Sequence, residues 1–237
     1  MAKRGSSDSL GVDVHERVRA DILRGEWEPG DRLSPGALAA RYQASTTVVR
    51  EALTRLAGQK FVALEPNRGF FVPRLRLAEL EDVTLFRSHV ESLALRLSIE
   101  RGDLTWESEL IACHHQLTRT PRRLPDAPDR TNDAWSNAHW AFHAKLIEAC
   151  RIPALLDVCS NLFDATELYR RWSAPQPGGS SRDVEAEHAG IVDAVLARDV
   201  ELATARLSAH YEKTVETLLA AGLVDGAAAT TASAKGD

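Results

Sequence analysis

The sequence predicts a mainly α-helical protein: an N-terminal winged helix-turn-helix with a small β-hairpin, then an all-α helical bundle of about six helices. Apolar residues recur at three- and four-residue steps through most of the 237 residues. Two apolar segments flank the turn Glu65-Pro-Asn-Arg-Gly69, as in a β-hairpin. Net charge is +3 over residues 1–75 and −8 over residues 76–237. A mildly basic part followed by an acidic one indicates two domains with different partners.

The N-terminal domain is expected over residues 12–75, after a polar and flexible segment at 1–11. Asp13 and Glu16 have capping-box spacing, which predicts a first helix from 13 to about 24. Ser34 and Pro35 start a second helix that ends near 42. A turn at 43–45 leads to a third helix over 46–58, and the hairpin closes the domain. This order of elements is that of a winged helix-turn-helix.

The second domain is expected over residues 79–222 and is helical throughout. Its first helix carries an apolar stripe made by Val83, Phe86, Val90, Leu93 and Leu97. Further helices are predicted at about 105–118, 130–149, 152–173, 183–197 and 199–221, with Pro- and Gly-rich breaks at 121–128 and 175–179. Residues 223–237 are small and polar and are expected to form a disordered tail.

Several classes of protein are excluded by composition. No apolar run approaches the roughly 18 residues that span a bilayer, and no apolar segment follows the basic N-terminus as in a secretory signal. The three cysteines contain no CxxC pair, so neither a disulfide framework nor a thiolate zinc site is indicated. We therefore expect a cytoplasmic protein without a membrane partner and without an organic cofactor.

The third helix has the two faces that a DNA-reading helix needs. Thr46, Thr47 and Arg50 lie opposite its apolar stripe. An arginine there can donate two hydrogen bonds to guanine or contact a phosphate, and threonine hydroxyls near a helix N-terminus can contact phosphates. Arg68 at the hairpin tip can reach the minor groove or the DNA backbone. By pattern alone, an ordinary amphipathic helix with a solvated polar face fits equally well.

The run LSPGALAARYQASTTVVREALTRLAGQKFVALEPNRGFFV, preceded by ILRGEWEPGDRL, resembles the DNA-binding domain of the GntR family of bacterial transcription regulators. About 60 residues are covered, including Ser45, the Val49-Arg-Glu-Ala-Leu53 block and the Arg68-Gly69 pair. The resemblance implies that Ser45, Thr46, Thr47, Arg50 and Arg68 contact operator DNA. Family members often carry arginine where this chain has Thr46, which suggests an altered operator or a weaker affinity.

Four histidines are placed on helix faces that should point into the bundle. His139 and His143 are four residues apart on one predicted helix, while His188 and His210 lie on two others. A single histidine in such a position is more often a core residue with a satisfied hydrogen bond. Four from three helices would each need a buried partner, and neutral imidazoles are good ligands for zinc, nickel, copper or iron. The sequence pattern is compatible with two interpretations: a shared metal site, or four separate core histidines.

The acidic part resembles the FCD effector-binding domain of the FadR subfamily of GntR regulators. The matches run from Leu80 to Leu219 and include Arg87, the Phe142-His143 pair, Glu187-His188 and His210. In many such domains a D-x-x-F-H motif and two later histidines bind a divalent metal, with a small carboxylate effector beside it. Here His139 replaces the aspartate.

The resemblance implies a metal held by His139, His143, His188 and His210, with zinc the first candidate and nickel the second, and an effector carboxylate bound by Arg87. An all-imidazole site would have one negative charge less and would favour borderline metals over magnesium. Alternatively, the histidines have abandoned metal and bind an anionic effector directly.

We expect a homodimeric repressor on a palindromic operator, controlled by a small organic acid. A dedicated metal sensor is the first alternative. A metallohydrolase is the second, but Trp140 stands where an HExxH motif has its catalytic glutamate.

Overall fold

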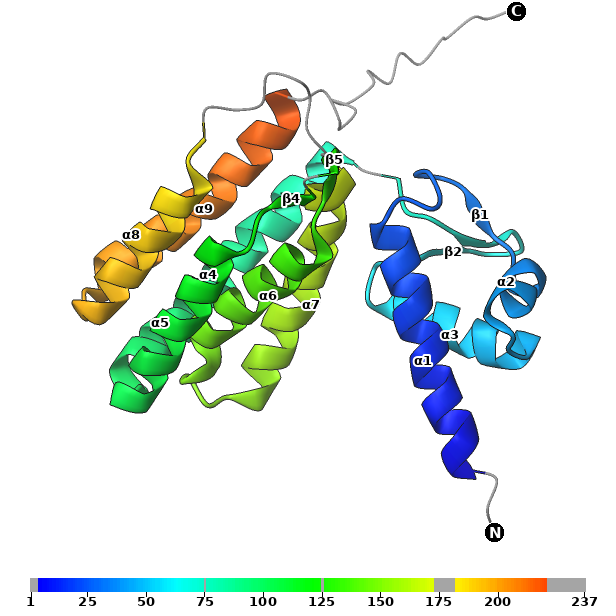
Figure 1. Cartoon of the computed structure of the whole chain (residues 1–237), viewed down its shortest axis with the longest axis horizontal. Helices are drawn as coiled ribbons and strands as arrows, with labels where there is room; N and C mark the ends of the chain where they lie inside the picture. Colours follow the sequence, from blue (N-terminus) through cyan, green and yellow to red (C-terminus); the bar gives the residue numbers. More distant parts are fainter. Residues whose placement is uncertain (1–3, 75, 125, 173–181, 221–237) are drawn as a thin grey trace, which may run out of the picture.

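The computed structural model describes residues 4–74, 76–124, 126–172 and 182–220. The predicted tail at 223–237 and the break at 175–179 lie outside these residues. The described chain forms two helical units side by side, a small N-terminal domain with a three-stranded sheet and a larger bundle (Figure 1). The mainly α-helical class is confirmed. No helix in the described ranges is long and apolar enough to cross a membrane.

The N-terminal domain is a three-helix unit closed by an antiparallel sheet. Its elements are α1 (Arg4–Leu23), β1 (Arg32–Leu33), α2 (Pro35–Tyr42), α3 (Thr46–Gly58), β2 (Ala63–Glu65) and β3 (Gly69–Phe71), with strand order β1-β3-β2. Gln43, in the left-handed region with φ 55°, ends α2 and directs the chain into α3. The apolar faces of α1 and α3 meet in a buried core that includes Val14, Val18 and Leu53.

The first helix starts earlier than expected. α1 begins at Arg4, so the predicted helix start at Asp13 is wrong. Asp13 does not cap; its carboxylate pairs with Arg17 one turn later inside the helix. The apolar stripe begins only at Val14, so periodicity could not reveal the preceding turns. The short strand β1, which pairs with β3, was not predicted because two residues carry no detectable alternation.

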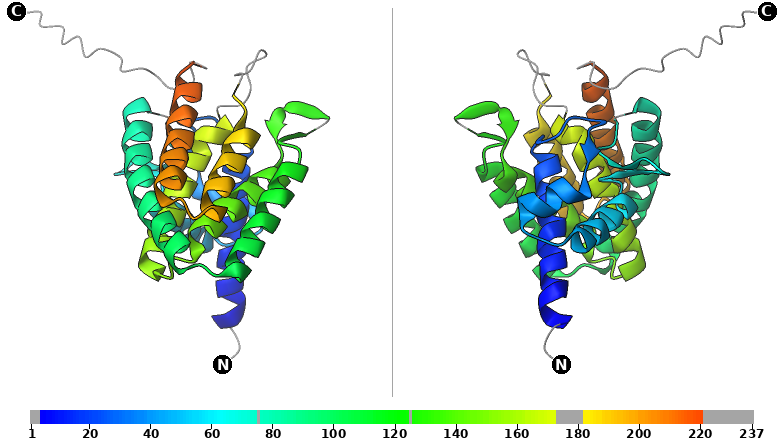
Figure 2. Two further views of the ribbon diagram at one scale, coloured as in Figure 1. Left: turned by 90° about the vertical axis from the view of Figure 1, so that its left-hand side faces the viewer. Right: turned by 90° about the vertical axis from the view of Figure 1, so that its right-hand side faces the viewer.

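The second unit is a six-helix bundle. Its helices are α4 (Leu77–Arg101), α5 (Leu104–Arg119), α6 (Asp133–Glu148), α7 (Pro153–Trp172), α8 (Val184–Leu196) and α9 (Val200–Ala220). Helix α4 packs against α6, α7 and α9, and α8 lies along α9 (Figures 1 and 2). The predicted break at 121–128 contains a hairpin, β4 (Arg123–Leu124) with β5 (Ala127–Thr131), which also takes residues 130 and 131 that were expected in α6.

Helix α4 corrects the predicted apolar stripe. Phe86 and Leu93 are exposed, together with Leu85, whereas Arg87 and Glu91 are buried. Both polar side chains are tolerated inside because they pair with each other through Arg87 Nε and Glu91 Oε1 at 2.5 Å. The inner face of α4 thus holds this ion pair among apolar residues such as Leu95, and Val90 and Leu97 of the predicted stripe still pack against the core.

Helix α7 of the bundle contacts the N-terminal domain. Leu168 of α7 is buried within the core of the N-terminal domain, beside residues of α1 and α3. Arg19 of α1 donates a hydrogen bond to Asp164, one turn before Leu168, and its guanidinium also stacks on Phe61. The N-terminal domain is therefore packed directly on a helix of the bundle.

Candidate metal centre and DNA-contacting surface

Helix α3 presents the polar face that the sequence predicted. Val49, Ala52, Leu53 and Leu56 are buried, whereas Thr46, Thr47 and Arg50 are exposed. Among the described residues Arg50 has no carboxylate partner. Its guanidinium is therefore available to a base edge or a phosphate.

The other two predicted DNA contacts already have partners within the protein. Ser45 is the N-cap of α3, and its hydroxyl accepts a hydrogen bond from the Val48 amide. Arg68, in the β2–β3 turn, is exposed but forms an ion pair with Glu65 and lies over the Phe71 ring. Arg68 is therefore already engaged in part by Glu65, whereas Arg50 has no carboxylate partner among the described residues.

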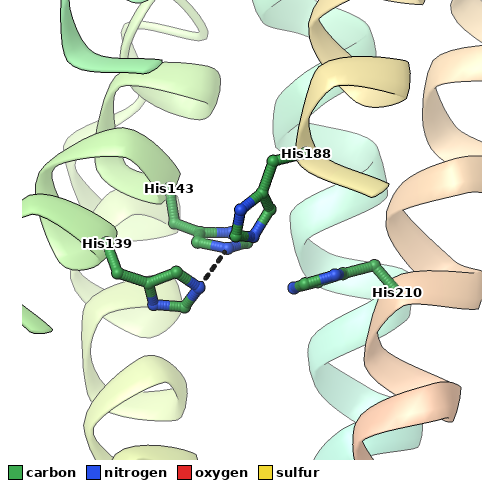
Figure 3. Close-up of side chains that lie close together, drawn as sticks. All are labelled: His139, His143, His188 and His210. Atoms are coloured by element: carbon green, nitrogen blue, oxygen red, sulfur yellow. Dashed lines mark hydrogen bonds between the residues drawn. The ribbon is translucent and has the colours of Figure 1, made fainter. Parts of the chain in front are cut away.

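The structure brings the four predicted histidines together. His139 and His143 come from α6, His188 from α8 and His210 from α9, and all four are buried. One ring nitrogen from each lies within 4.8 Å of those of the other three, and the imidazoles face a common centre (Figure 3). Nitrogens around a tetrahedral zinc are separated by about 3.4 Å, so the cluster is slightly wider than a closed site.

Hydrogen bonds behind the rings determine which nitrogen of each histidine can bind a metal. His210 Nδ1 lies 2.8 Å from Glu187 Oε2 and 3.2 Å from Arg182 NH2, which itself donates to Glu187 and to the His210 carbonyl. With Nδ1 donating to the nearer carboxylate, the Nε2 lone pair of His210 faces the centre. His143 Nδ1 lies 3.2 Å from the Tyr211 hydroxyl, which itself donates to Glu91. His188 Nε2 is buried and has no hydrogen-bond partner among the described residues. A buried imidazole nitrogen without a hydrogen-bond partner has a lone pair that can coordinate a metal when the ring is neutral.

The surroundings of the four histidines favour the neutral form of each imidazole. Burial, and then the neighbouring histidines and arginines, hold the pKa values of His139, His143 and His188 well below their usual range. Burial also lowers the pKa of His210 to about 4, although Glu187 opposes this. Neutral imidazole is the form that binds metals, so the cluster needs no deprotonation near neutral pH.

A small cavity adjoins the histidines and is lined by four arginines. Its volume is about 50 Å³, and its wall includes His139 and His210 together with Arg87, Arg122, Arg170 and Arg182. Arg87, the predicted effector-binding residue, is buried there, but its N–H groups already donate to Glu91, Thr166 and Tyr211. Burial tends to lower its pKa, and the Glu91 carboxylate together with the Tyr211 hydroxyl outweighs burial and raises it. Arg87 thus lines the cavity with its positive charge already balanced by the Glu91 carboxylate.

Sequence reasoning missed three of these arginines and the groups that support the histidines. Arg170 and Arg182 form ion pairs with Glu167 and Glu187 respectively. Arg122 lies over the Trp135 ring, and no carboxylate of the described residues pairs with it. Arg170 could have been found, because Phe163, Glu167 and Arg170 follow the helical spacing of one buried face. Arg122 could not, because it precedes a hairpin that periodicity does not detect.

The fold and these sites define a DNA-binding protein in which a winged helix-turn-helix is packed on a helical bundle that holds the histidine cluster. Residues 10–72 match the model of the bacterial regulatory proteins of the gntR family, and residues 82–213 match the FCD domain. The chain belongs to the GntR family of transcriptional regulators and carries an FCD domain.

Relatives and solved structures agree with this assignment. The chain is 34% identical to the HTH-type transcriptional regulator BphR of Paraburkholderia xenovorans over 91% of this chain and 88% of that protein. It is 29% identical to the HTH-type transcriptional repressor GlaR of Escherichia coli over 84% and 91%. The structure of E. coli McbR/YncC superposes with a TM-score of 0.71 at 21% identity, covering 89% of this chain and 97% of that one. These proteins are transcriptional regulators, so the chain is a regulator and not the metallohydrolase considered above.

Proposed function

We propose that this protein is a homodimeric repressor whose affinity for a palindromic operator is controlled by a metal and a small carboxylate effector in the bundle. The observation that carries the proposal is the buried cluster of four imidazoles beside an arginine-lined cavity. The donor set fits a borderline divalent metal, with zinc first and nickel second. His139, His143, His188 and His210 are the candidate ligands. When bound, the metal supplies a Lewis-acidic centre that attracts a carboxylate.

The arginines give the cavity its preference for anions. Arg122 presents a guanidinium with no carboxylate partner in the described part of the chain, whereas Arg170 and Arg182 line the same space and are each paired with a glutamate. A planar guanidinium binds carboxylate through two parallel hydrogen bonds. The volume of about 50 Å³ suits a small acid rather than a long-chain one.

An exposed apolar face supports the dimer. Leu85, Phe86 and Leu93 on α4 are 62%, 54% and 51% exposed, and His89 lies among them on the same face. Large apolar side chains gathered on one helix are typical of a surface that is covered by a partner. A second copy of the chain would bury this face and place two α3 helices for two half-sites. The name of the relative GlaR supports the repressor role.

A second candidate function is a dedicated metal sensor. Four protein ligands complete a tetrahedral zinc site and leave no position for an acid, as in structural zinc sites. If all four histidines bind, the metal itself becomes the effector. Operator release that follows the metal concentration without any organic acid would favour this reading.

Elemental analysis of untagged protein, purified without chelator, tests the metal. About one zinc or nickel per chain is expected, with loss in His143→Ala and retention in His115→Ala, which removes an exposed histidine. Operator binding is then measured with and without metal across a panel of small acids. A chain that takes up no metal even from excess would refute the metal-dependent mechanism and leave the arginine cavity as a direct anion site.

The operator is tested separately. Because Thr46 replaces the arginine common in the family, selection from a random DNA library should return a sequence that differs from the usual family consensus. Recovery of the common consensus would refute the altered operator.

A further inference from the structure

A cavity that the sites above do not use lies between the two domains. Its volume is about 340 Å³, within the range of about 300–1,000 Å³ that is usual for small-molecule sites. The wall of this interdomain cavity includes Arg19, Gln59, Ser136, Trp140, Phe163 and Asp164. Arg19 belongs to α1 and Gln59 is the C-cap of α3, whereas the other four residues come from α6 and α7 (Figure 1). None of the described residues lines both this cavity and the arginine cavity, so the two are separate.

The wall of the interdomain cavity contains a buried hydroxyl group without a hydrogen bond. Ser136 of α6 is 4% exposed, and its Oγ has no hydrogen-bond partner among the described residues. A buried hydroxyl group without a partner is unfavourable, and alanine at the same position would avoid this cost. A ligand in the cavity would give Ser136 Oγ the partner that the described chain does not provide.

The charged groups of the cavity favour a cationic ligand over an anionic one. Both guanidinium groups of its wall are already paired, since Arg19 donates to Asp164 Oδ1 at 2.7 Å and Arg171 donates to Glu167 Oε1 at 2.6 Å. The other carboxylate oxygen of Asp164, Oδ2, accepts no hydrogen bond from the described residues. Burial raises the pKa of Asp164 in spite of the opposing effect of Arg19. A second cation beside this carboxylate would therefore stabilise its negative charge.

Aromatic side chains connect the interdomain cavity to an apolar one. Trp140 and Phe163 line the interdomain cavity and also a cavity of about 470 Å³ whose wall comes mainly from α6 and α7. Apolar side chains of this second wall include Ala144, Ile147 and Leu156. A protonated amine is attracted to the faces of aromatic rings, and a hydrocarbon group attached to it would be buried in the apolar cavity. The two adjoining cavities thus suit one molecule with a cationic end and an apolar body.

We propose that the interdomain cavity is a second ligand site, which binds a small amine with an apolar body. The ammonium group would pair with Asp164 and form a hydrogen bond with Ser136, while the apolar body would pack against Trp140 and Phe163. This site depends neither on the metal centre nor on the arginine cavity. Because Gln59 ends α3, an occupant of the cavity touches the N-terminal domain directly. Its binding therefore changes operator affinity without passing through the histidine cluster.

Isothermal titration calorimetry with four matched probes tests the chemistry of the site. Phenethylamine carries both the cation and the ring, phenylpropionate replaces the cation by an anion, phenethyl alcohol is neutral, and ethylamine lacks the ring. Phenethylamine should bind about tenfold more tightly than each of the others, because each of these lacks either the positive charge or the apolar body. Binding of phenylpropionate as tight as that of phenethylamine, or no binding of any probe, would overturn the proposal.

Two substitutions locate the bound amine. Ser136→Ala should lower phenethylamine affinity about three- to tenfold, while the free protein keeps or gains stability. Its matched control is Ser98→Ala, because Ser98 Oγ is also buried without a partner among the described residues but does not line the cavity. Asp164→Asn should lower the affinity about tenfold or more, whereas Asp193→Asn, an exposed change on α8, should not. Unchanged affinity in both Ser136→Ala and Asp164→Asn would show that the amine binds elsewhere and would contradict the proposal.

A third substitution blocks the site without altering the ion pair between Arg19 and Asp164. Ser160 is exposed and lines both adjoining cavities, so Ser160→Phe should fold normally and occupy the space of the apolar body. Phenethylamine binding should be lost in this variant. Asn161→Phe is the control, because Asn161 is an exposed neighbour on α7 that lines neither cavity. Binding that survives in Ser160→Phe would mean that the cavity is not the site.

Operator binding distinguishes this site from the metal centre. Fluorescence anisotropy with the operator selected as above should show that saturating phenethylamine changes the operator affinity about fivefold or more. The change should be the same in His143→Ala, which lacks one of the candidate metal ligands. An effect that disappears in His143→Ala would assign the amine to the metal centre and overturn the proposal. An unchanged operator affinity at saturation would refute control of DNA binding from this cavity, whatever the outcome of the metal analysis.

Discussion

Arg19 of α1 and Asp164 of α7 form an ion pair of 2.7 Å that connects the DNA-binding domain to the bundle. Burial raises the pKa of Asp164, and Arg19 opposes this shift. Helix α7 also carries Arg170, which contacts the candidate metal centre. One helix therefore touches both the operator-reading domain and the site where a metal and an effector are proposed to bind.

The first prediction concerns this contact. Asp164→Asn should reduce the dependence of operator affinity on metal, because the two domains lose a charged link worth roughly 1–2 kcal/mol. Fluorescence anisotropy with operator DNA, with and without Zn²⁺, gives the ratio of affinities. Asp157→Asn, an exposed change on the same helix, is the control. An unaltered ratio in Asp164→Asn would mean that coupling takes another route.

Arg50→Ala should abolish specific DNA binding and leave metal binding intact. Loss of one base contact costs about 1–3 kcal/mol per half-site, and a dimer loses two contacts. Anisotropy and Zn²⁺ titration on the same preparation separate the two effects. Arg96→Ala, which removes an exposed arginine of α4, should change neither. If Arg50→Ala lost both functions, the residue would be structural.

Phe86→Glu should dissociate the proposed dimer. A carboxylate in the middle of the exposed apolar face of α4 would be buried without a partner in a dimer, which is unfavourable by several kcal/mol. Sedimentation velocity should show a monomer, and operator affinity should fall with it. Ile111→Glu, an exposed apolar residue on α5, is the matched control. A Phe86→Glu protein that sediments as a dimer would place the interface elsewhere.

The metal-free protein should lose stability in acid. The four buried histidines have pKa values lowered in the folded chain, whereas unfolded histidine titrates near 6.5, so the unfolded chain binds more protons. The stabilisation that the folded chain gains from its neutral histidines is fully present above about pH 6.5. It is lost as the pH falls toward about 4, the pKa of His210 in the folded chain. For His210 alone, the difference between the folded and unfolded pKa values corresponds to about 3 kcal/mol in the free energy of unfolding.

Urea unfolding of chelator-treated protein between pH 7.5 and about 4.5 measures this loss. His210→Gln should flatten the pH dependence, whereas the exposed change His115→Gln should not. An unfolding free energy that stays constant across this range would show that the four rings do not titrate as neutral buried groups.

The sequence predicted most of this fold, because the helices of the bundle and α3 have long amphipathic patterns. Helix α4 was the exception. Phe86 and Leu93 fitted the predicted apolar stripe but are exposed, whereas Val90 and Leu97 of the same stripe pack against the core, and the inner face also holds the Arg87–Glu91 ion pair. Periodicity shows that a helix has an apolar face. It does not show whether that face lies in the core or at an interface, because polar residues that pair with each other can be buried instead.

The candidate site was predicted in part. Four histidines on inward faces of three helices were expected to meet, and they do. The groups that determine their protonation were not predicted, because Arg170, Glu187 and Tyr211 reach them from other turns or other helices. Sequence spacing shows which residues share a face, but a tautomer depends on contacts across the bundle.

The position of Leu168 affects whether the two domains can be produced as separate proteins. This leucine extends from the bundle into the core of the N-terminal domain, where it is 2% exposed. A bundle produced alone would expose Leu168 to water, and the DNA-binding domain alone would have a gap where it packs. Each half would lose roughly 1.5–3 kcal/mol of apolar burial. Separated domains should therefore be less stable and more prone to aggregate than the intact chain, and a leucine-to-lysine change at 168 would help the isolated bundle while harming the whole protein.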